Sequence, residues 1–458
     1  MRKAPLDSAL RIMVKFPKNR KAGKKQRVTK ERMLKMGHNP DIYLLYEYME
    51  KVPFTVRMKV CLDAPVDAAL LTEAAQEAIG RLPYFSVKVG LDAGQNYTLE
   101  HNDRPVAVLP EKNERLTLGS EAVNGHLIAI TYRDDCIWFN YSHTFCGAMG
   151  GLFWVKATLY QYMTKKYGPL EAPKDIKLPG TPVTEGELYF PDADKLPDDE
   201  PIFRYEGGDC NLQLPRMLKY LLNPFARDCY YYQIEIPAGD FMDYAARIDG
   251  SPNTILTAMM FKVCSRLFKE KEGTFLSGRI SADYRKDIGA NESYRDFVRF
   301  IHIKYEWSMK DESVQKLNMR ARGALIRQNQ PELSYERFRR LDKAHQGIDA
   351  QPNLKAKKKY ASQNSTFRSD PRDTYTISYV GQTDWGGMEA HIKSFYTITD
   401  GDLMIEVNAL KDIFCITFQL INKDPKPLEL FCELMKQEGL PYKVSERYTR
   451  YMPKIKLP

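Results

Sequence analysis

The chain has 458 residues, of which 43% are hydrophobic and 28% are charged. This usage is ordinary for globular proteins and excludes collagen-like, coiled-coil and wholly disordered chains. At ~150 residues per domain, the length allows two or three domains or two large lobes. No uncharged apolar run reaches the ~18 residues of a membrane span, and no apolar segment with a cleavage site follows the basic N-terminus. We therefore expect a cytoplasmic protein.

The net charge of +9 is distributed unevenly. Residues 1–35 hold 13 Lys and Arg against 2 Asp and Glu, so this basic arm carries +11 and the remainder carries −2. Nucleic-acid-binding proteins present a basic face on their folded part, so the near-neutral remainder argues against nucleic acid as a partner. The run 18–27 (KNRKAGKKQR) is too highly charged to fold alone. It predicts either a solvated tail or a segment that docks on an acidic partner.

The eight cysteines do not form a recognisable ligand or redox motif. None belongs to a C-x-x-C pair, and none stands at zinc-ligand spacing from a histidine. Most lie within apolar runs such as 136–139 (CIWF). The pattern predicts buried thiols in a cytosolic protein and no metal site.

Apolar periodicity divides residues 36–167, the predicted N-terminal lobe, into strands and helices. Asp67 precedes one helical segment and is suited to cap its first backbone N–H groups. Residues 133–135 separate two strand segments and predict a hairpin. The expected elements in chain order are strand 54–62, helix 68–81, strand 86–89, strands 126–132 and 136–142, and helix 149–167.

Residues 168–215 contain eight prolines and an acidic run at 198–200, which predict a long irregular crossover between lobes. Residues 216–458, the predicted C-terminal lobe, again mix strand and helix patterns, so the fold class is α+β. The expected elements here are strands 230–236, 278–283, 298–305, 375–380, 403–407 and 414–420, helices 254–269, 311–343 and 428–438, and loops 285–295 and 355–373.

The most informative segment is 138–154, WFNYSHTFCGAMGGLFW, where an apolar strand leads into a glycine-rich helix start. Here the sequence resembles the chloramphenicol-acetyltransferase-like superfamily, which includes alcohol acetyltransferases, plant acyltransferases of the H-x-x-x-D type and condensation domains of peptide synthetases. The signature of this superfamily is a histidine, three residues and then Asp-Gly. On this chain His143 takes the place of the histidine, Gly147 stands in place of Asp, and Ala148 in place of Gly.

The resemblance continues in the same order along residues 40–450. Segment 67–89 resembles the family's opening helix and strand, and 97–106 resembles the segment that follows in bacterial alcohol-acetyltransferase relatives. Segment 282–298 resembles a strand ending in an x-x-Arg element followed by an Asn-Phe-Val segment. The residues that carry these similarities are Arg81, Pro83 and Phe85, then Asp283-Tyr284-Arg285 and Asp296-Phe297-Val298, and finally 377–381 (ISYVG).

This resemblance implies an α/β sandwich of two chloramphenicol-acetyltransferase-like lobes with a tunnel between them. A thioester donor, acyl-CoA or an acyl carrier protein, would enter at one mouth and a hydroxyl or amine acceptor at the other, with no bound cofactor. His143 would be the general base, because a neutral imidazole within ~3 Å of the acceptor can take its proton during attack. The expected substrate contacts are Ser142, Cys146, Gly147, Ser378 and Gly381, and the expected structural residues are Arg285 and Gly150.

The basic arm also has expected partners under this resemblance. Coenzyme A carries phosphates, acyl carrier proteins are acidic, and bacterial inner leaflets are anionic. The run 18–27 would attract each of them, at roughly 1 kcal/mol per basic residue close to an anionic surface. An acidic carrier protein and an anionic membrane surface are therefore the expected partners of the arm.

The loss of the motif's acid at Gly147 leaves other interpretations open. One is a catalytically silent member of the fold that binds a ligand or a protein partner in the tunnel. The motif's acid usually orients the loop through an ion pair, so Arg285 is the first residue to examine for a missing partner. An acyl-enzyme on Cys146, paired with His143, is an alternative to a small buried side chain. Residues 384–387 (DWGG) resemble the plant D-F-G-W-G element but are expected to form a structural turn.

Overall fold

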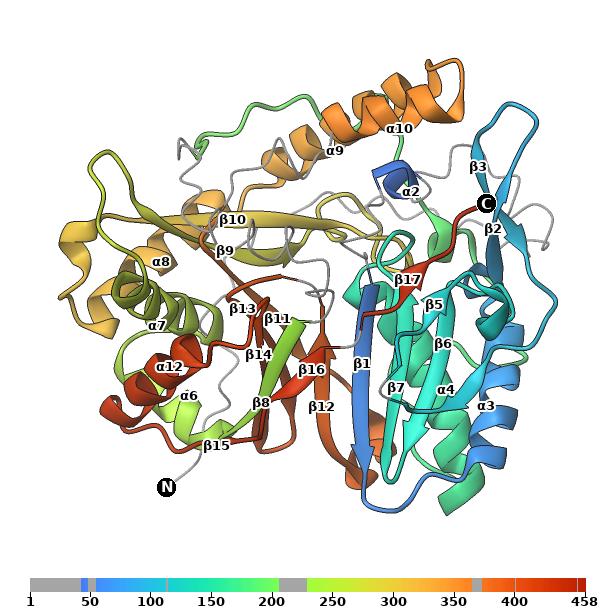
Figure 1. Cartoon of the computed structure of the whole chain (residues 1–458), viewed down its shortest axis with the longest axis horizontal. Helices are drawn as coiled ribbons and strands as arrows, with labels where there is room; N and C mark the ends of the chain where they lie inside the picture. Colours follow the sequence, from blue (N-terminus) through green and yellow to red (C-terminus); the bar gives the residue numbers. More distant parts are fainter. Residues whose placement is uncertain are drawn as a thin grey trace, which may run out of the picture.

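The computed structural model describes residues 43–47, 55–112, 114–205, 229–364, 373–399, 401–450 and 452–458. The basic arm at 1–35, with its charged run, lies outside the described residues. Two α+β halves lie side by side, each with a sheet and covering helices (Figure 1). None of the helices in the described part combines the length and apolar character that a membrane crossing requires.

The first sheet has the strand order β12-β1-β7-β6-β4. Helices α3 and α4 pack on each other and bury apolar side chains in one core with this sheet. Two small two-stranded sheets, β2 with β3 and β5 with β17, flank it. The elements are β1 (Thr55–Leu62), α3 (Ala68–Arg81), β2 (Val87–Leu91), β3 (Tyr97–His101), β4 (Val108–Pro110), β5 (Thr117–Leu118), β6 (Ile128–Arg133), β7 (Cys136–Ser142), α4 (Ala148–Tyr167), β12 (Ile392–Ile398) and β17 (Lys454–Ile455).

Local chemistry explains the bounds of these elements, and it confirms the predicted first strand, capped helix and hairpin. The Asp67 carboxylate accepts hydrogen bonds from the backbone N–H groups of Ala69 and Leu70, as an N-cap does. β6 and β7 pair in antiparallel register around Asp134, whose φ of +53° lies in the left-handed region that Asp tolerates in turns. These features depend on residues close in sequence, so the sequence alone could predict them.

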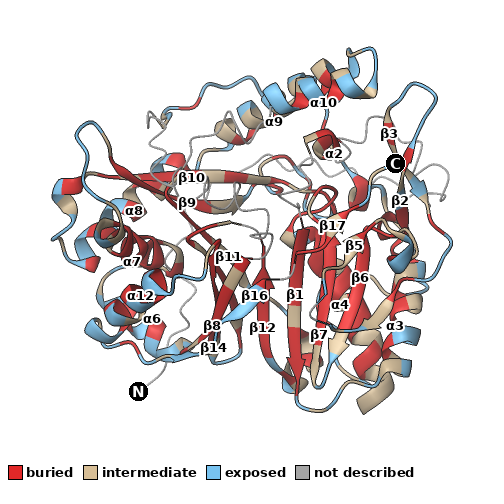
Figure 2. Cartoon of the chain, in the orientation of Figure 1, coloured by how far each residue is buried: buried red, intermediate tan, exposed pale blue. Residues whose placement is uncertain are grey.

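The second sheet has the order β10-β9-β11-β13-β14-β8, and β8 also pairs with β15 and β16. Its own core includes the almost wholly buried helix α7. The central strands of both sheets are buried over most of their length, whereas α9 (Pro331–Asp349) and α10 (Leu354–Gln363) expose one side (Figure 2). The elements are β8 (Cys229–Pro237), α6 (Ala238–Arg247), α7 (Pro252–Leu267), β9 (Leu276–Asp283), β10 (Val298–Tyr305), α8 (Val314–Gln328), α9 (Pro331–Asp349), β11 (Tyr375–Gln382), β13 (Met404–Leu410), β14 (Ile413–Leu420), α12 (Lys426–Gln437), β15 (Lys443–Val444) and β16 (Tyr448–Arg450).

Several elements were not predicted, and three of them matter most for the architecture. Strand β12 comes from the second half of the chain but pairs with β1 of the first sheet, with Arg57 opposite Ile398. Helix α6 was not expected, and the predicted loop 355–373 is wrong over its first part, which forms α10 (Leu354–Gln363). The Lys357 Nζ donates to the Ile348 and Asp349 carbonyls at the end of α9, so contacts with the end of the preceding helix stabilise α10. The short helix α2 (Tyr43–Glu47) also packs against α10.

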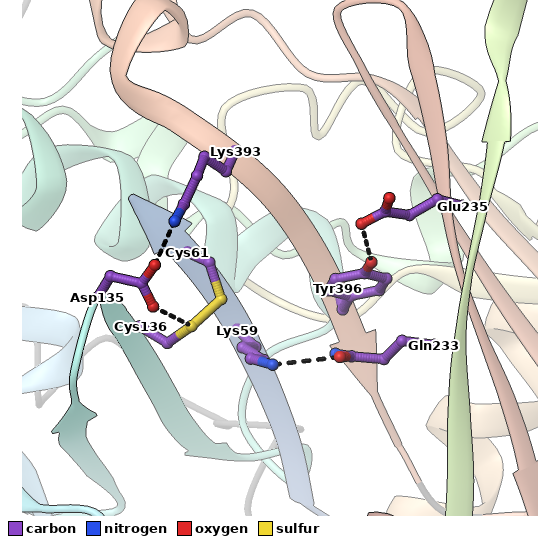
Figure 3. The surroundings of a disulfide bond; sticks show 8 residues. All are labelled: Lys59, Cys61, Asp135, Cys136, Gln233, Glu235, Lys393 and Tyr396. Carbon is purple, nitrogen blue, oxygen red and sulfur yellow. Dashed lines mark hydrogen bonds and ion pairs between the residues drawn. A yellow bond between two sulfur atoms is a disulfide. The ribbon is translucent and has the colours of Figure 1, made fainter. Parts of the chain in front are cut away.

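The cysteine prediction is wrong at two positions, because Cys61 and Cys136 form a disulfide (Figure 3). The register of β1 and β7 places them directly opposite each other, with Cα atoms 4.1 Å apart across a sequence separation of 75. Pairing register is a tertiary property, so cysteine spacing gave no signal for this bond. Cys210 lies outside the described residues, and the remaining cysteines, Cys146, Cys229, Cys264, Cys415 and Cys432, are thiols.

Polar contacts close to the disulfide join the two sheets. The Lys59 Nζ of β1 donates to the Gln233 Oε1 of β8 at 3.2 Å, and the Tyr396 Oη of β12 donates to the Glu235 Oε1 of β8 at 3.0 Å (Figure 3). Desolvation lowers the pKa of Lys59 to about 8. The two halves are thus connected by paired polar groups as well as by the chain.

Candidate active site

The turn that carries His143 begins where β7 ends, at Ser142, and finishes where α4 begins, at Ala148. The Ser142 Oγ lies 2.6 Å from the Thr144 Oγ1 and accepts from the Thr144 N–H at 3.2 Å, so the serine side chain closes the turn. The Phe145 carbonyl accepts from the Tyr84 Oη at 2.5 Å. His143 remains 30% exposed between these fixed neighbours. The turn therefore presents one imidazole from an otherwise buried segment.

The glycines that follow are required by close packing rather than by backbone conformation. Gly147 has φ −81° and ψ −179°, which any residue adopts. A Cβ at Gly147 would lie only 2.5 Å from the Asp296 Oδ1, and a Cβ at Gly150 only 1.8 Å from the Tyr294 carbonyl oxygen. A Cβ at Gly151 would lie 2.6 Å from the Tyr141 ring. The first turn of α4 thus lies directly against β7 and against the loop 284–297 of the other half.

That loop brings an acid to the histidine. The Asp296 Oδ2 lies 3.6 Å from the His143 Nδ1, with the Asp296 side chain 24% exposed. The Asp296 Oδ1 is buried and has no hydrogen-bond partner. Asp296 was not among the predicted site residues, although the sequence contains a signal for it. Asp296 stands where the resembling segment has Asn, in a chain that lacks the acid at Gly147.

Arg285, the residue first considered for a missing partner, has partners. It forms an ion pair with Asp283, its Nε donates to the Ser293 carbonyl at 3.2 Å, and a terminal nitrogen donates to the Arg295 carbonyl. These bonds cross the loop 284–297 and hold it closed. Arg285 therefore acts within its own loop, two residues beyond the end of β9.

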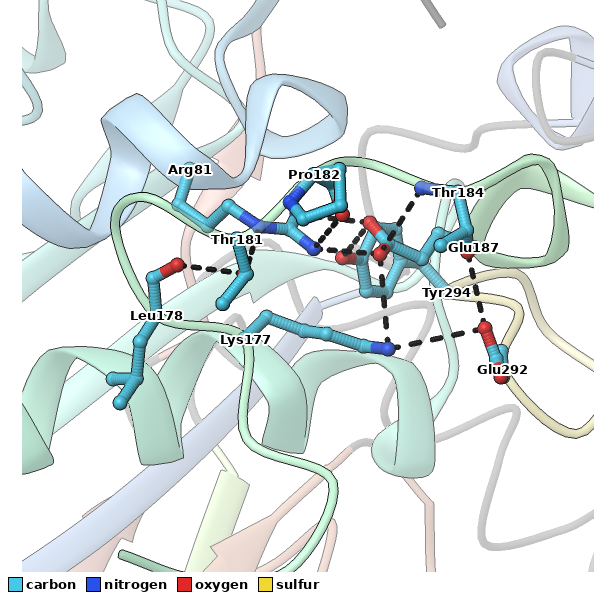
Figure 4. A network of polar contacts seen from close by, with 9 residues as sticks. All are labelled: Arg81, Lys177, Leu178, Thr181, Pro182, Thr184, Glu187, Glu292 and Tyr294. Atoms are coloured by element: carbon cyan, nitrogen blue, oxygen red, sulfur yellow. Dashed lines mark hydrogen bonds and ion pairs between the residues drawn. The ribbon is translucent and has the colours of Figure 1, made fainter. Parts of the chain in front are cut away.

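A second acid–base network anchors the same loop (Figure 4). The carboxylate of Glu187, a residue of the crossover, accepts two hydrogen bonds from Arg81 of α3, at 2.7 and 2.9 Å. It also accepts from the Tyr294 Oη at 2.7 Å, and the Tyr294 N–H donates to the Glu187 carbonyl at 3.0 Å. Burial by itself raises the pKa of Glu187, but the bonds from Arg81 and Tyr294 outweigh it and lower that pKa. The network joins α3, the crossover and the loop.

The other expected substrate contacts lie in two places. Cys146 is in the turn but fully buried in the first core, so its side chain meets apolar neighbours. Ser378 and Gly381 are half-buried on β11 of the second sheet. β11 pairs with β9 only through residues 375–377, so both residues lie beyond that pairing. The described contacts do not join them to the His143 turn, and their role as substrate contacts stays a prediction.

Residues 384–387 form the structural turn that was expected. The Asp384 carboxylate accepts from the backbone N–H groups of Lys174 and Gly386, at 2.8 and 3.0 Å. The Gly387 N–H donates to the Glu171 carbonyl at 2.8 Å, and Trp385 is buried. This turn fastens the start of the crossover to the chain just before β12.

No side-chain cluster in the described part of the chain is suited to a metal. The single group of His, Cys and acidic residues with ligand atoms within 4.8 Å of one another consists of Cys61, Asp135 and Cys136. Both sulfurs belong to the disulfide and are unavailable as thiolate ligands. The groups that the turn itself presents are the His143 imidazole, the neighbouring Asp296 carboxylate and the backbone N–H groups.

No protein-family model and no curated protein sequence matches the chain. Solved structures do match. TRI101 of Fusarium graminearum, in complex with ethyl coenzyme A, superimposes with a TM-score of 0.56 at 11% identity, over 87% of this chain and 98% of that one. Polyketide synthase associated protein 5 of Mycobacterium tuberculosis superimposes with a TM-score of 0.52 at 11% identity, over 87% of this chain and 95% of that one. The first condensation domain of the CDA synthetase superimposes with a TM-score of 0.51 at 11% identity, over 87% of this chain and 93% of that one.

These matches establish the fold. The chain has the two-lobed α+β fold of the chloramphenicol-acetyltransferase-like acyltransferases and condensation domains, as the sequence resemblance predicted. The likeness extends over most of the chain and over nearly the whole of each matched structure, so it describes both halves together.

Proposed function

We propose that this protein is an acyltransferase that moves an acyl group from a thioester donor, acyl-CoA or an acyl carrier protein, to a hydroxyl or amine acceptor, with His143 as general base. The observation that carries the proposal is the placement of His143. It is partly exposed at the end of a buried strand, with Nδ1 beside the Asp296 carboxylate. This arrangement leaves Nε2 as the nitrogen that can receive a proton.

The matched structures support the choice of donor. TRI101 of Fusarium sporotrichioides was solved with coenzyme A and T-2, and TRI101 of F. graminearum with coenzyme A and deoxynivalenol. Coenzyme A and a second small molecule are thus bound together in each of these two matched structures. An acyl carrier protein as donor is the corresponding possibility suggested by the condensation domains among the matches.

The reaction then follows from the chemistry of the turn. Nε2 of His143 takes the proton of the acceptor as its oxygen or nitrogen attacks the thioester carbonyl, and a C–O or C–N bond forms. The C–S bond breaks, and the leaving thiolate receives the proton from the imidazolium. The carbonyl oxygen carries negative charge in between and needs aimed donors. The first N–H groups of α4, which have no acceptor within the helix, are suited to this role.

A thiol-release assay tests the proposal. Purified full-length protein is incubated with acetyl-CoA and longer acyl-CoA donors, together with a panel of alcohols and amines, and released thiol is detected. We expect acceptor-dependent thiol release that falls about 10²- to 10⁴-fold in His143→Ala, the usual contribution of a general base. The matched control is His101→Ala, which removes a histidine on β3 of the first half and should leave turnover unchanged.

Two results would count against the proposal. Thiol release in His143→Ala equal to that of the unaltered protein would remove His143 from the mechanism. A folded protein that releases no thiol with any donor and acceptor, but binds coenzyme A, would favour the silent binding protein instead.

A further inference from the structure

The space beside Gly147 is filled by an acid from the other half of the molecule. Asp296 belongs to the loop that joins β9 to β10. A Cβ built on Gly147 would lie 2.5 Å from the Asp296 Oδ1 and 3.0 Å from its Cγ. The carboxyl group of Asp296 therefore occupies the volume into which a side chain at position 147 would project. The acid that the motif lacks in sequence is present there in space.

This carboxyl group is directed at the catalytic candidate. Its Oδ2 lies 3.6 Å from the His143 Nδ1, while its Oδ1 is buried without a hydrogen-bond partner. A buried carboxylate oxygen without a donor is costly, so a donor that reaches the group stabilises it. An Nδ1–H on His143 would be such a donor. With the hydrogen on Nδ1, the lone pair of a neutral imidazole lies on Nε2.

The loop that carries Asp296 is fixed independently of the histidine. The backbone of Tyr294 is anchored to Glu187 and lies against Gly150 of α4. The Ser293 Oγ donates to the Tyr189 carbonyl at 2.9 Å, and the Arg295 Nε donates to the Leu188 carbonyl at 3.1 Å. Asp296 follows directly after these anchored residues. Its carboxyl group is therefore held against α4 by residues that are not part of the reaction.

The nearby arginine does not take the acid. The described bonds of the Arg285 side chain go to Asp283 and to the carbonyls of Ser293 and Arg295. The described ion pair of Asp296 is with His143. Because the Arg285 side chain already donates to three acceptors, the His143 imidazole is the better-placed partner for the Asp296 carboxylate.

We propose that Asp296 is the positioning residue of His143, and that it replaces from the second half of the chain the acid that position 147 lacks. It selects the Nδ1–H tautomer and holds the ring so that Nε2 faces the acceptor. The inference rests on the proposed acyl transfer for its kinetic test, but its spectroscopic test is independent of any activity.

The spectroscopic test measures the tautomer directly. Full-length protein labelled with ¹⁵N-histidine is examined by NMR above neutral pH, and the His143 signals are assigned from their loss in His143→Ala. We expect His143 to be protonated on Nδ1 in the unaltered protein and to shift toward protonation on Nε2 in Asp296→Asn. The same tautomer in both proteins, or protonation on Nε2 in the unaltered one, would overturn the inference.

The kinetic test moves the acid from one half to the other. We expect Asp296→Asn and Asp296→Gly to lower kcat about 10- to 100-fold while KM changes less than about threefold, as when an orienting acid is removed. Gly147→Asp alone should also lower kcat, because its carboxyl group meets that of Asp296. The double variant Gly147→Asp with Asp296→Gly should recover at least about tenfold in kcat over Asp296→Gly.

The outcomes separate the two proposals. Unchanged kcat in Asp296→Asn overturns the positioning role, and a double variant no better than Asp296→Gly overturns the replacement of one acid by the other. Thermal unfolding of each variant shows whether a loss of kcat comes from a loss of folded protein. If the unaltered protein transfers no acyl group, the proposed function fails, and the NMR measurement still decides the relation of Asp296 to His143.

Discussion

Two acid–base pairs meet the loop 284–297 in different ways. In the Arg81–Glu187 pair both side chains are at most 4% exposed, the nearest approach is 2.7 Å, and the carboxylate also accepts from Tyr294. In the His143–Asp296 pair the atoms are 3.6 Å apart, the side chains are 30% and 24% exposed, and one acid oxygen has no partner.

Under the proposed function, this difference distinguishes a pair that holds the loop in place from a pair that takes part in the reaction. A buried carboxylate whose acceptor sites are all filled keeps its neighbours in one arrangement, and it has no capacity left for a substrate. A looser pair that faces solvent retains a nitrogen for proton transfer, and apo sites commonly show such long contacts. The first pair fixes the loop, and the loop then places the acid of the second pair.

The largest expected effect on stability comes from the Arg81–Glu187 pair. Glu187→Gln leaves the Arg81 guanidinium buried without its counter-charge, and removing one partner of a buried pair costs about 3 kcal/mol or more of unfolding free energy. Denaturant titration followed by circular dichroism measures it. The matched control is Glu121→Gln, which breaks a two-bonded pair of the same type with Arg104 on the surface and should cost far less. Equal losses would contradict the contrast between the two environments.

A smaller loss is expected where the loop lies on α4. In Gly150→Ala the new methyl group meets the backbone carbonyl of Tyr294, a residue held in place by the hydrogen bond from its N–H to the Glu187 carbonyl. Such overpacking costs about 1 to 3 kcal/mol of unfolding free energy. The control is Gly80→Ala in α3, where no atom lies within 4 Å of the added group. That change should stabilise the helix by about 0.5 to 1 kcal/mol. Thermal unfolding midpoints that move in the same direction for both variants would argue against the packing explanation.

The Arg81–Glu187 pair also predicts that the unfolding free energy decreases in acid. The pKa of Glu187 is below its ordinary value of 4.5 in the folded protein, so the unfolded chain binds more protons as the pH falls. The contribution of Glu187 is therefore complete above about pH 4.5 and is lost as the pH falls through the folded pKa. Unfolding free energies between pH 6 and pH 3 should decline less steeply in Glu187→Gln than in the unaltered protein. Parallel curves would exclude Glu187 as a source of the decline.

The smallest effect on stability is expected from the His143–Asp296 pair. His143 is partly exposed and its turn is fixed by Ser142, Thr144 and Phe145. We expect His143→Ala to change the unfolding free energy by less than about 0.5 kcal/mol, as for most substitutions outside the core. The same denaturant titration measures it, and a loss as large as that of Glu187→Gln would make His143 a structural residue.

Most of the regular structure could be predicted from the sequence. Period-two alternation gave β1 and the β6–β7 hairpin, helical spacing with Asp67 as cap gave α3, and the strand-to-helix step around His143 was located correctly. These elements depend on residues close together in the chain. The ordered resemblance added the two-lobed fold, which the matched structures establish.

Only the tertiary structure decided which distant residues meet. Cys61 and Cys136 face each other because of the register of β1 and β7, β12 joins the first sheet by pairing with a strand about 330 residues earlier, and Asp296 fills the space beside Gly147. Each contact arises from the way packed elements are placed, and no local pattern encodes that placement. The sequence by itself therefore determined the turn and its histidine, and the packing of the two halves determined the acid beside it.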